Sequence, residues 1–180
     1  MPDQTTKDAF ASIIGVDRLH ITLSPFQAEA AINKMVTAHV VTRYTLVDAI
    51  LADTIITYFF KAEPPSQRFE SGWPSDEMRI FTHHILDETF LLKKLSIVHA
   101  IGPVPSETTA IIHKLNAVRN ALAHSFIPEN RKEYKASGKV LYANVDIRTP
   151  DGLKAFEADV DRAIDYLHDR AYGPTLGSTT

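Results

Sequence analysis

The chain has 180 residues, of which 44% are hydrophobic and 23% are charged, and its formal net charge at pH 7 is −3. These values predict a globular protein whose single domain is large enough to bury a core. Because the sequence contains no cysteine, disulfides, thiolate metal sites and cysteine nucleophiles are excluded. The first ten residues lack the basic and then apolar order of a signal peptide, and the most apolar run, residues 47–60, is too short to span a bilayer. We therefore expect a soluble, cytoplasmic protein.

The first third of the sequence predicts a long helical region. Residues 1–23 form an N-terminal segment in which residues 7–14 favour a short helix. Ser24 can cap a helix whose first position is Pro25, and helix-favouring residues continue to about Lys61, as one helix or as two. Three prolines and a glycine interrupt this pattern in residues 62–75.

A second helix is predicted from about Asp76 to His99. Ser75 can accept a hydrogen bond at its start, and the acidic residues of the first turn favour the positive end of the helix dipole. Steps of three and four residues predict a single apolar face that contains Phe81, Ile85, Leu92 and Leu95. The adjacent histidines 83 and 84 point about 100° apart on a helix, which makes them a poor metal chelate.

The remaining sequence predicts two more helices and a hairpin. A third helix covers residues 106–126, and Pro128 ends it. Residues 140–142 and 145–147 can pair as a short hairpin, and a last helix begins at Thr149 and ends at Gly173. The sequence thus predicts an all-α fold: an antiparallel bundle of four to five helices in residues 24–172, with a short β-hairpin near 139–148 and a flexible tail at 173–180.

The third helix is expected to have two chemically different faces. Because successive residues turn by about 100°, one narrow arc collects the apolar residues Ile111, Leu115, Val118, Leu122 and Phe126. Asn116, Asn120 and His124 follow one another at steps of four and form a polar stripe. Arg119 lies at the border of the two faces, with Asn120 between Arg119 and His124. Small residues, namely Ala117, Ala121 and Ala123, would let another helix approach closely.

Glu88 is predicted to interrupt the apolar face of the second helix. A carboxylate at such a position should not be buried without a partner, and Arg119 on the following helix is the obvious candidate. We hypothesise that Glu88 pairs with Arg119 and orients its guanidinium. The alternative interpretation of the polar stripe is a helix–helix seam in which the asparagines and the histidine satisfy one another without any catalysis.

A local excess of basic residues follows the polar stripe. Residues 113–139 contain six lysines and arginines against two glutamates, although the whole chain is slightly acidic. Such a patch can attract phosphate, although a solvated, lysine-containing loop explains the same charge. Within it, Lys132 and Lys135 are the candidates for contacts with flanking phosphates.

The string from Arg119 to His124, Arg-Asn-Ala-Leu-Ala-His, resembles the signature of the HEPN superfamily. That signature is an arginine, usually followed by a polar residue, placed four to six positions before a histidine within a helix of an all-α bundle. The resemblance is strongest over residues 105–127 and extends over about residues 25–170. It implies an all-α fold, in many members a metal-independent endoribonuclease, and an assembly in which a homodimer brings two Arg–His sets together.

The resemblance also implies roles for individual residues and a kind of partner. His124 would transfer protons and Arg119 would stabilise charge on the phosphate. Asn120 would orient the phosphate or the imidazole, supported by Asn116. No cofactor or metal is implied. Many relatives are toxins paired with a nucleotidyltransferase-type antitoxin, and some carry a tyrosine two residues after the histidine that this antitoxin modifies. Here that position is Phe126, which argues against control by that route.

A different branch of the family supplies the main alternative function. The chain is also similar to the mannitol repressor group, whose members are all-helical and of similar size and contain a related Arg-Asn…Ala-His string. That resemblance implies a non-enzymatic helical regulator or scaffold, and other branches bind nucleotides. Cleavage of RNA in the presence of EDTA separates the two classes.

Overall fold

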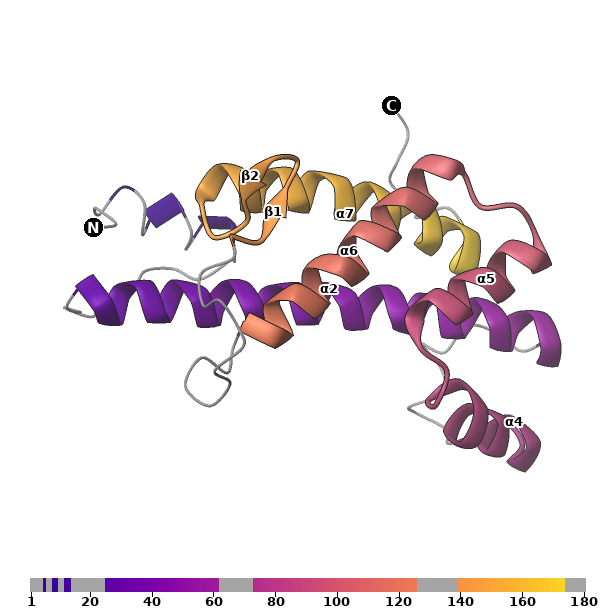
Figure 1. Cartoon of the computed structure of the whole chain (residues 1–180). Coiled ribbons are helices and arrows are strands. Elements are labelled where there is room, and N and C mark those ends of the chain that lie inside the picture. The colour runs from indigo at the N-terminus through magenta and orange to yellow at the C-terminus, as the bar shows by residue number, and fades with distance from the viewer. Residues whose placement is uncertain are drawn as a thin grey trace. The chain divides into compact units, whose positions relative to one another are not determined.

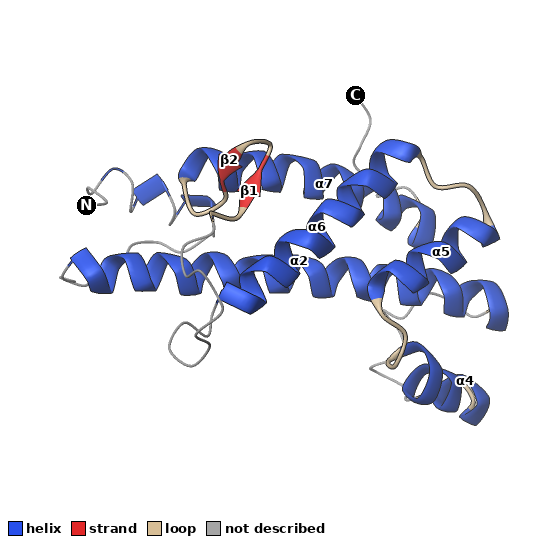
Figure 2. Cartoon of the chain, in the orientation of Figure 1, coloured by secondary structure: helices blue, strands red, loops and turns tan. Residues whose placement is uncertain are grey.

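The computed structural model describes residues 25–61, 73–125 and 139–173, together with five isolated positions between 5 and 13; the side chains of residues 25–28, 124 and 125 lie outside this description. Within these ranges the chain forms five α-helices, one π-helical segment and a two-stranded antiparallel hairpin (Figures 1 and 2). The helices are α2 (Pro25–Phe60), α4 (Asp76–Phe81), α5 (Leu91–Ile101), α6 (Ser106–Ser125) and α7 (Pro150–Tyr172). The prediction of an all-α fold with a short hairpin is confirmed.

The chain divides into two compact units, and both are discontinuous in sequence. One unit contains residues 1–43 and 117–160, and the other contains residues 44–116 and 161–180. Helices α2, α6 and α7 therefore each contribute one segment to each unit. In the first unit the buried side chains include Ile32, Val36, Val40, Val118, Leu122, Tyr142, Leu153 and Phe156; in the second they include Leu51, Ile55, Leu86, Leu91, Val98, Ile112, Leu115 and Leu167.

Helix α2 is a single helix of 36 residues, which decides between the two predicted forms. Its buried positions Ile32, Val36 and Val40 follow at steps of four, as expected for one face of a helix. The helix ends before Lys61, whose φ of 52° lies in the left-handed region that commonly terminates helices. The predicted cap at Ser24 and the proline-rich residues 62–72 lie outside the described residues.

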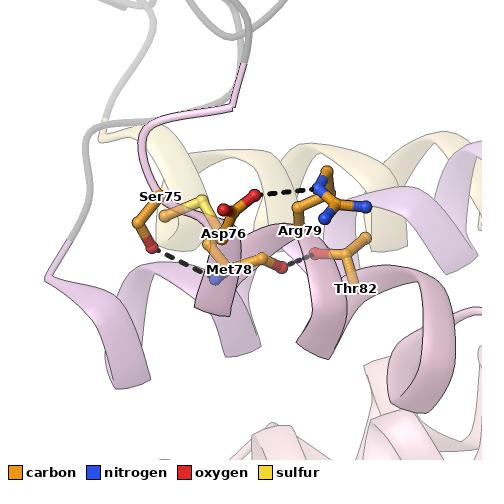
Figure 3. Close-up of polar contacts among 5 residues, drawn as sticks. All are labelled: Ser75, Asp76, Met78, Arg79 and Thr82. Carbon is orange, nitrogen blue, oxygen red and sulfur yellow. Dashed lines mark hydrogen bonds and ion pairs between the residues drawn. The ribbon is translucent and has the colours of Figure 1, made fainter.

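The prediction of one continuous helix over residues 76–99 is wrong. Its start is as expected, because the Ser75 hydroxyl accepts a hydrogen bond of 3.2 Å from the backbone N–H of Met78 (Figure 3). Helix α4, however, ends at Phe81 and is followed by the π-helical segment η2 (Thr82–Leu86), in which the N–H of Asp87 bonds to the carbonyl of Thr82 at 2.9 Å. Residues 87–90 then leave the helix, and α5 begins at Leu91.

The π-helical segment changes which residues face the core. A π-helical turn contains one more residue than an α-helical turn, so Met78 and Leu86 are the buried residues, at 2% and 1% exposure. Ile85, which was predicted on the buried face, is 50% exposed. Leu95 in α5 is buried as predicted. The periodicity of the sequence therefore indicated the buried side correctly at Leu95 and wrongly at Ile85, while Phe81 and Leu92 are half-buried.

The hairpin and the last helix agree with the prediction. Strands β1 (Leu141–Tyr142) and β2 (Val145–Asp146) pair through Leu141 with Asp146 and Tyr142 with Val145. The two turn residues between the strands both have positive φ, which is the conformation of a type I′ turn. The Tyr142 hydroxyl donates to Asp159 of α7 at 2.7 Å and so attaches the hairpin to that helix.

Candidate functional site

Helix α6 presents the expected apolar face to the protein interior. Ile111, Leu115, Val118 and Leu122 are at most 5% exposed, so this part of the prediction is confirmed, while Phe126 lies outside the described residues. Glycine and prolines separate α6 from α5, and the chain reverses direction between these helices (Figure 1). Burial of this arc fixes the rotation of the helix about its axis and thus the position of its polar residues.

The polar residues of α6 lie at the edge of this buried arc. Asn116, Arg119 and Asn120 are all half-buried. Arg119 donates a hydrogen bond from Nη1 to Oδ1 of Asn120 at 3.1 Å. The guanidinium of Arg119 thus lies beside the side chain of Asn120, its neighbour in the sequence. This contact brings together two of the predicted site residues.

Two parts of the predicted site are not covered by the description. His124 belongs to α6 and follows Asn120 by four positions, which makes them neighbours on the helix surface, but its side chain lies outside the described residues. Lys132 and Lys135 also lie outside them. The geometry of the candidate site is therefore that of Arg119, Asn120 and Asn116.

The outward face of α6 carries few large side chains. Ala117, Ala121 and Ala123 are exposed, as are His113 and Lys114. The small residues keep this face low beside the half-buried asparagines, as the sequence predicted. Among the described residues, these small side chains leave the backbone of α6 close to the surface.

The position of Glu88 removes the reason for expecting its pairing with Arg119. That prediction assumed a carboxylate on the buried face of a continuous helix, whereas Glu88 is exposed in the turn between η2 and α5. An exposed carboxylate is solvated and needs no buried partner. The pairing itself stays a prediction.

A charged cluster in the first unit was not found by the sequence reasoning. His39 Nε2 lies 2.9 Å from one carboxylate oxygen of Glu157, and Arg43 Nε lies 3.3 Å from the other. All three side chains are only 16–17% exposed. The available signal was the spacing of His39 and Arg43, since residues four positions apart share a helix face. Their partner on α7 could not be identified from the sequence.

The adjacent histidines 83 and 84 show no geometry of a metal site among the described residues. His83 Nδ1 lies 3.0 Å from a carboxylate oxygen of Asp87, and its ring meets the edge of Trp73 at a centroid distance of 5.1 Å. In the part of the chain that the structure describes, no group of three or more His, Asp or Glu side chains could hold a metal ion. None of the described helices is long and apolar enough to cross a membrane.

Comparison with known proteins adds no further information about the site. No protein-family model, curated protein or solved structure matches this chain. The HEPN resemblance therefore depends on the residues of α6 and on their setting in an all-α fold.

Proposed function

We propose that the protein binds RNA at α6 and cleaves it without a metal ion, as HEPN ribonucleases do. The observation that carries this proposal is the hydrogen bond from Arg119 to Asn120. It holds the guanidinium beside Asn120, and His124 follows Asn120 by four positions, about one helical turn. A positive, phosphate-binding group and a proton-transfer group would thereby belong to one surface.

The chemistry of the proposed reaction matches the residues present. Cleavage by internal transfer requires removal of the proton of the 2′-hydroxyl, protonation of the leaving oxygen, and positive charge beside the phosphate. In our proposal His124 transfers a proton, because histidine exchanges protons near neutral pH. Arg119 stays charged and binds phosphate oxygens through its planar group of donors. Asn120 holds the guanidinium in place, and Asn116 supports the stripe.

The proposal extends to flanking phosphates and to partners. Lys132 and Lys135 would bind neighbouring phosphates of the RNA, which would make binding sensitive to salt. Each chain carries a single Arg–His set, and the family resemblance favours a homodimer that brings two sets together. An antitoxin-like protein is a candidate partner, but it would not act by modifying a tyrosine, because Phe126 occupies the position of the tyrosine that is modified in some relatives.

The test is cleavage of a labelled single-stranded RNA in buffer with EDTA. We expect wild-type cleavage that leaves 2′,3′-cyclic phosphate ends and spares DNA of the same sequence, which lacks the attacking hydroxyl. His124→Ala and Arg119→Ala should each lower the rate by about 10²–10³. His113→Ala is the matched control, because His113 is an exposed histidine of the same helix, and its rate should stay within about twofold of wild type.

Two results would contradict the ribonuclease proposal. One is the absence of cleavage by wild-type protein, and the other is equal cleavage by wild type and both site variants, which would indicate a contaminating nuclease. RNA binding without cleavage would favour the non-enzymatic regulator or scaffold that resembles the mannitol repressor group.

A further inference from the structure

A group of exposed apolar side chains lies where the end of α2 meets α4 and η2, entirely within the second unit. This group, which we call the apolar ridge, consists of Tyr58, Phe59, Ile80, Phe81 and Ile85. Four of its side chains are between 47% and 57% exposed, and Phe81 is half-buried. Contiguous apolar surface on a folded domain commonly marks a site of interaction.

The side chains of the apolar ridge form one continuous surface. The ring of Phe59 meets the ring of Tyr58 at a centroid distance of 5.2 Å and the ring of Phe81 at 6.0 Å. Phe81 and Ile85 are four positions apart and therefore lie on one side of the helical segment. In a π-helical turn residues five positions apart become neighbours, which brings Ile80 to the side of Ile85. The π-helical segment, which leaves Ile85 out of the core, thus extends the ridge.

Two glutamates border the apolar ridge on α4 and beyond η2. Glu77 precedes Ile80 by three positions, Glu88 follows Ile85 by three positions, and both glutamates are exposed. Within the part of the chain that the structure describes, neither carboxylate forms an ion pair. Their charges are therefore available to a binding partner.

The other charged groups near the ridge are already engaged. Asp76 pairs with Arg79 at 3.2 Å (Figure 3), and Asp87 lies 3.0 Å from the ring of His83. At the α2 end of the ridge the Lys61 ammonium lies 4.8 Å from the centre of the Tyr58 ring, a favourable cation–π contact. The charge that the ridge offers to a partner along α4 and η2 is thus negative.

This combination of apolar surface and negative charge selects the chemistry of the partner. RNA and anionic lipid are themselves negative and would be repelled by Glu77 and Glu88. The ridge is built on helical elements without a strand edge, so a partner cannot add a β-strand here. The remaining mode is helix packing, in which side chains of one helix fit between side chains of another.

We propose that the apolar ridge binds a basic amphipathic helix of another protein. Apolar side chains of that helix would cover Phe59 and Ile85, and lysines or arginines at its edge would pair with Glu77 and Glu88. Aromatic residues are enriched in the centres of protein interfaces, and complementary charges at the rim accelerate association and select the partner. The proposal does not depend on RNA cleavage at α6.

Fluorescence anisotropy with labelled synthetic peptides tests the chemistry of the partner. The probe is a helix-forming peptide of leucine and lysine, about five turns long, with its leucines on one face. It should bind the full-length protein at least about tenfold more tightly than two controls. One control has the same composition with the leucines spread around the helix, and the other has glutamate in place of lysine.

Substitutions in the protein test the location of the site. Phe59→Ser/Ile85→Ser removes apolar surface and should weaken binding of the leucine–lysine peptide at least about tenfold. Leu141→Ser/Val145→Ser is the matched control, because these apolar residues are 54% and 38% exposed outside the ridge, and its affinity should be unchanged. Circular dichroism verifies that both variants are as helical as wild type.

A second pair of variants tests the two carboxylates. Glu77→Gln/Glu88→Gln should weaken binding about three- to tenfold and reduce its dependence on salt. Asp165→Asn/Asp169→Asn removes two exposed carboxylates of α7 and serves as the matched control for net charge. Its affinity should stay within about twofold of wild type if the two glutamates act locally.

A tryptophan placed in the ridge reports occupancy directly. The chain contains one tryptophan, so Trp73→Phe/Phe59→Trp moves the single indole to a position that is 57% exposed. Binding of the leucine–lysine peptide should cover this indole and shift its emission to shorter wavelength. An unchanged emission spectrum at saturating peptide would show that the peptide binds elsewhere and would overturn the proposal.

The remaining outcomes also decide the question. Equal affinity for the three peptides, or full affinity of Phe59→Ser/Ile85→Ser, would refute the proposal. Binding of labelled single-stranded RNA, or of vesicles of phosphatidylcholine and phosphatidylglycerol, that Phe59→Ser/Ile85→Ser abolishes would replace the basic helix by that ligand.

Discussion

A buried ion pair between α2 and α5 allows an asymmetric prediction about stability. The Lys94 ammonium lies 2.6 Å from a carboxylate oxygen of Asp48, and the two side chains are 4% and 28% exposed. Asp48→Asn would leave the ammonium buried beside a neutral group. Loss of one partner of a fully buried pair costs about 3–5 kcal/mol; because Asp48 reaches solvent, we expect a smaller loss of about 2–4 kcal/mol in the free energy of unfolding.

Removal of the other partner, Lys94, should lower the free energy of unfolding much less. Lys94→Met removes the buried charge and replaces it with an unbranched apolar side chain of similar length. Asp48 then loses its partner but remains partly solvated, so we expect the free energy of unfolding to change by no more than about 1 kcal/mol. The double variant Asp48→Asn/Lys94→Met should resemble Lys94→Met alone, because no buried charge remains in either protein.

Urea denaturation followed by circular dichroism measures these changes. Urea is preferred to guanidinium because a salt would screen the ion pair. The slope of free energy against urea concentration must be the same in all four proteins for the values to be comparable. Equal losses in Asp48→Asn and Lys94→Met, or a loss below about 1 kcal/mol in Asp48→Asn, would show that the burial of the ammonium does not control the stability of this contact.

Two further substitutions test contacts at the ends of helices by the same urea measurement. Gly152→Ala should destabilise the protein by about 3 kcal/mol, because the added Cβ would lie 2.2 Å from the backbone oxygen of Asp146; an unchanged midpoint would refute this close approach. Arg170→Leu should cost about 2 kcal/mol, because the guanidinium donates to the carbonyls of Val98 and Gly102 at the end of α5, at 3.0 and 2.8 Å. Arg170→Lys should recover only part of the loss, since a single ammonium cannot reproduce the planar arrangement of donors, and full recovery would contradict the reasoning.

The boundaries of most helices could be predicted because local residues determine them. Pro25 suits a first turn, Ser75 accepts the bond expected of a cap, and Gly173 ends α7 with a φ of 83°. The apolar arc of α6 was also predictable, since its periodicity is regular and its opposite face is polar or small. Arg119, Asn120 and Asn116 lie at the edge of that arc and are half-buried.

Which side of an element is buried depended on the tertiary structure wherever the local pattern was ambiguous. In residues 76–90 the spacing predicted one apolar face that contains Ile85, but the structure buries Met78 and Leu86 on either side of a π-helical turn and leaves Ile85 and Glu88 exposed. The apolar residues of α2 are spread around the helix and do not gather on one side, so its sequence predicted a helix but not the exposed positions of Val41 and Leu46. Caps and turns act over a few neighbouring residues, whereas burial depends on surfaces contributed by distant parts of the chain. The sequence alone therefore determined most of the helices and the composition of the α6 stripe, and the tertiary structure decided which residues of 76–90 and which side of α2 are buried.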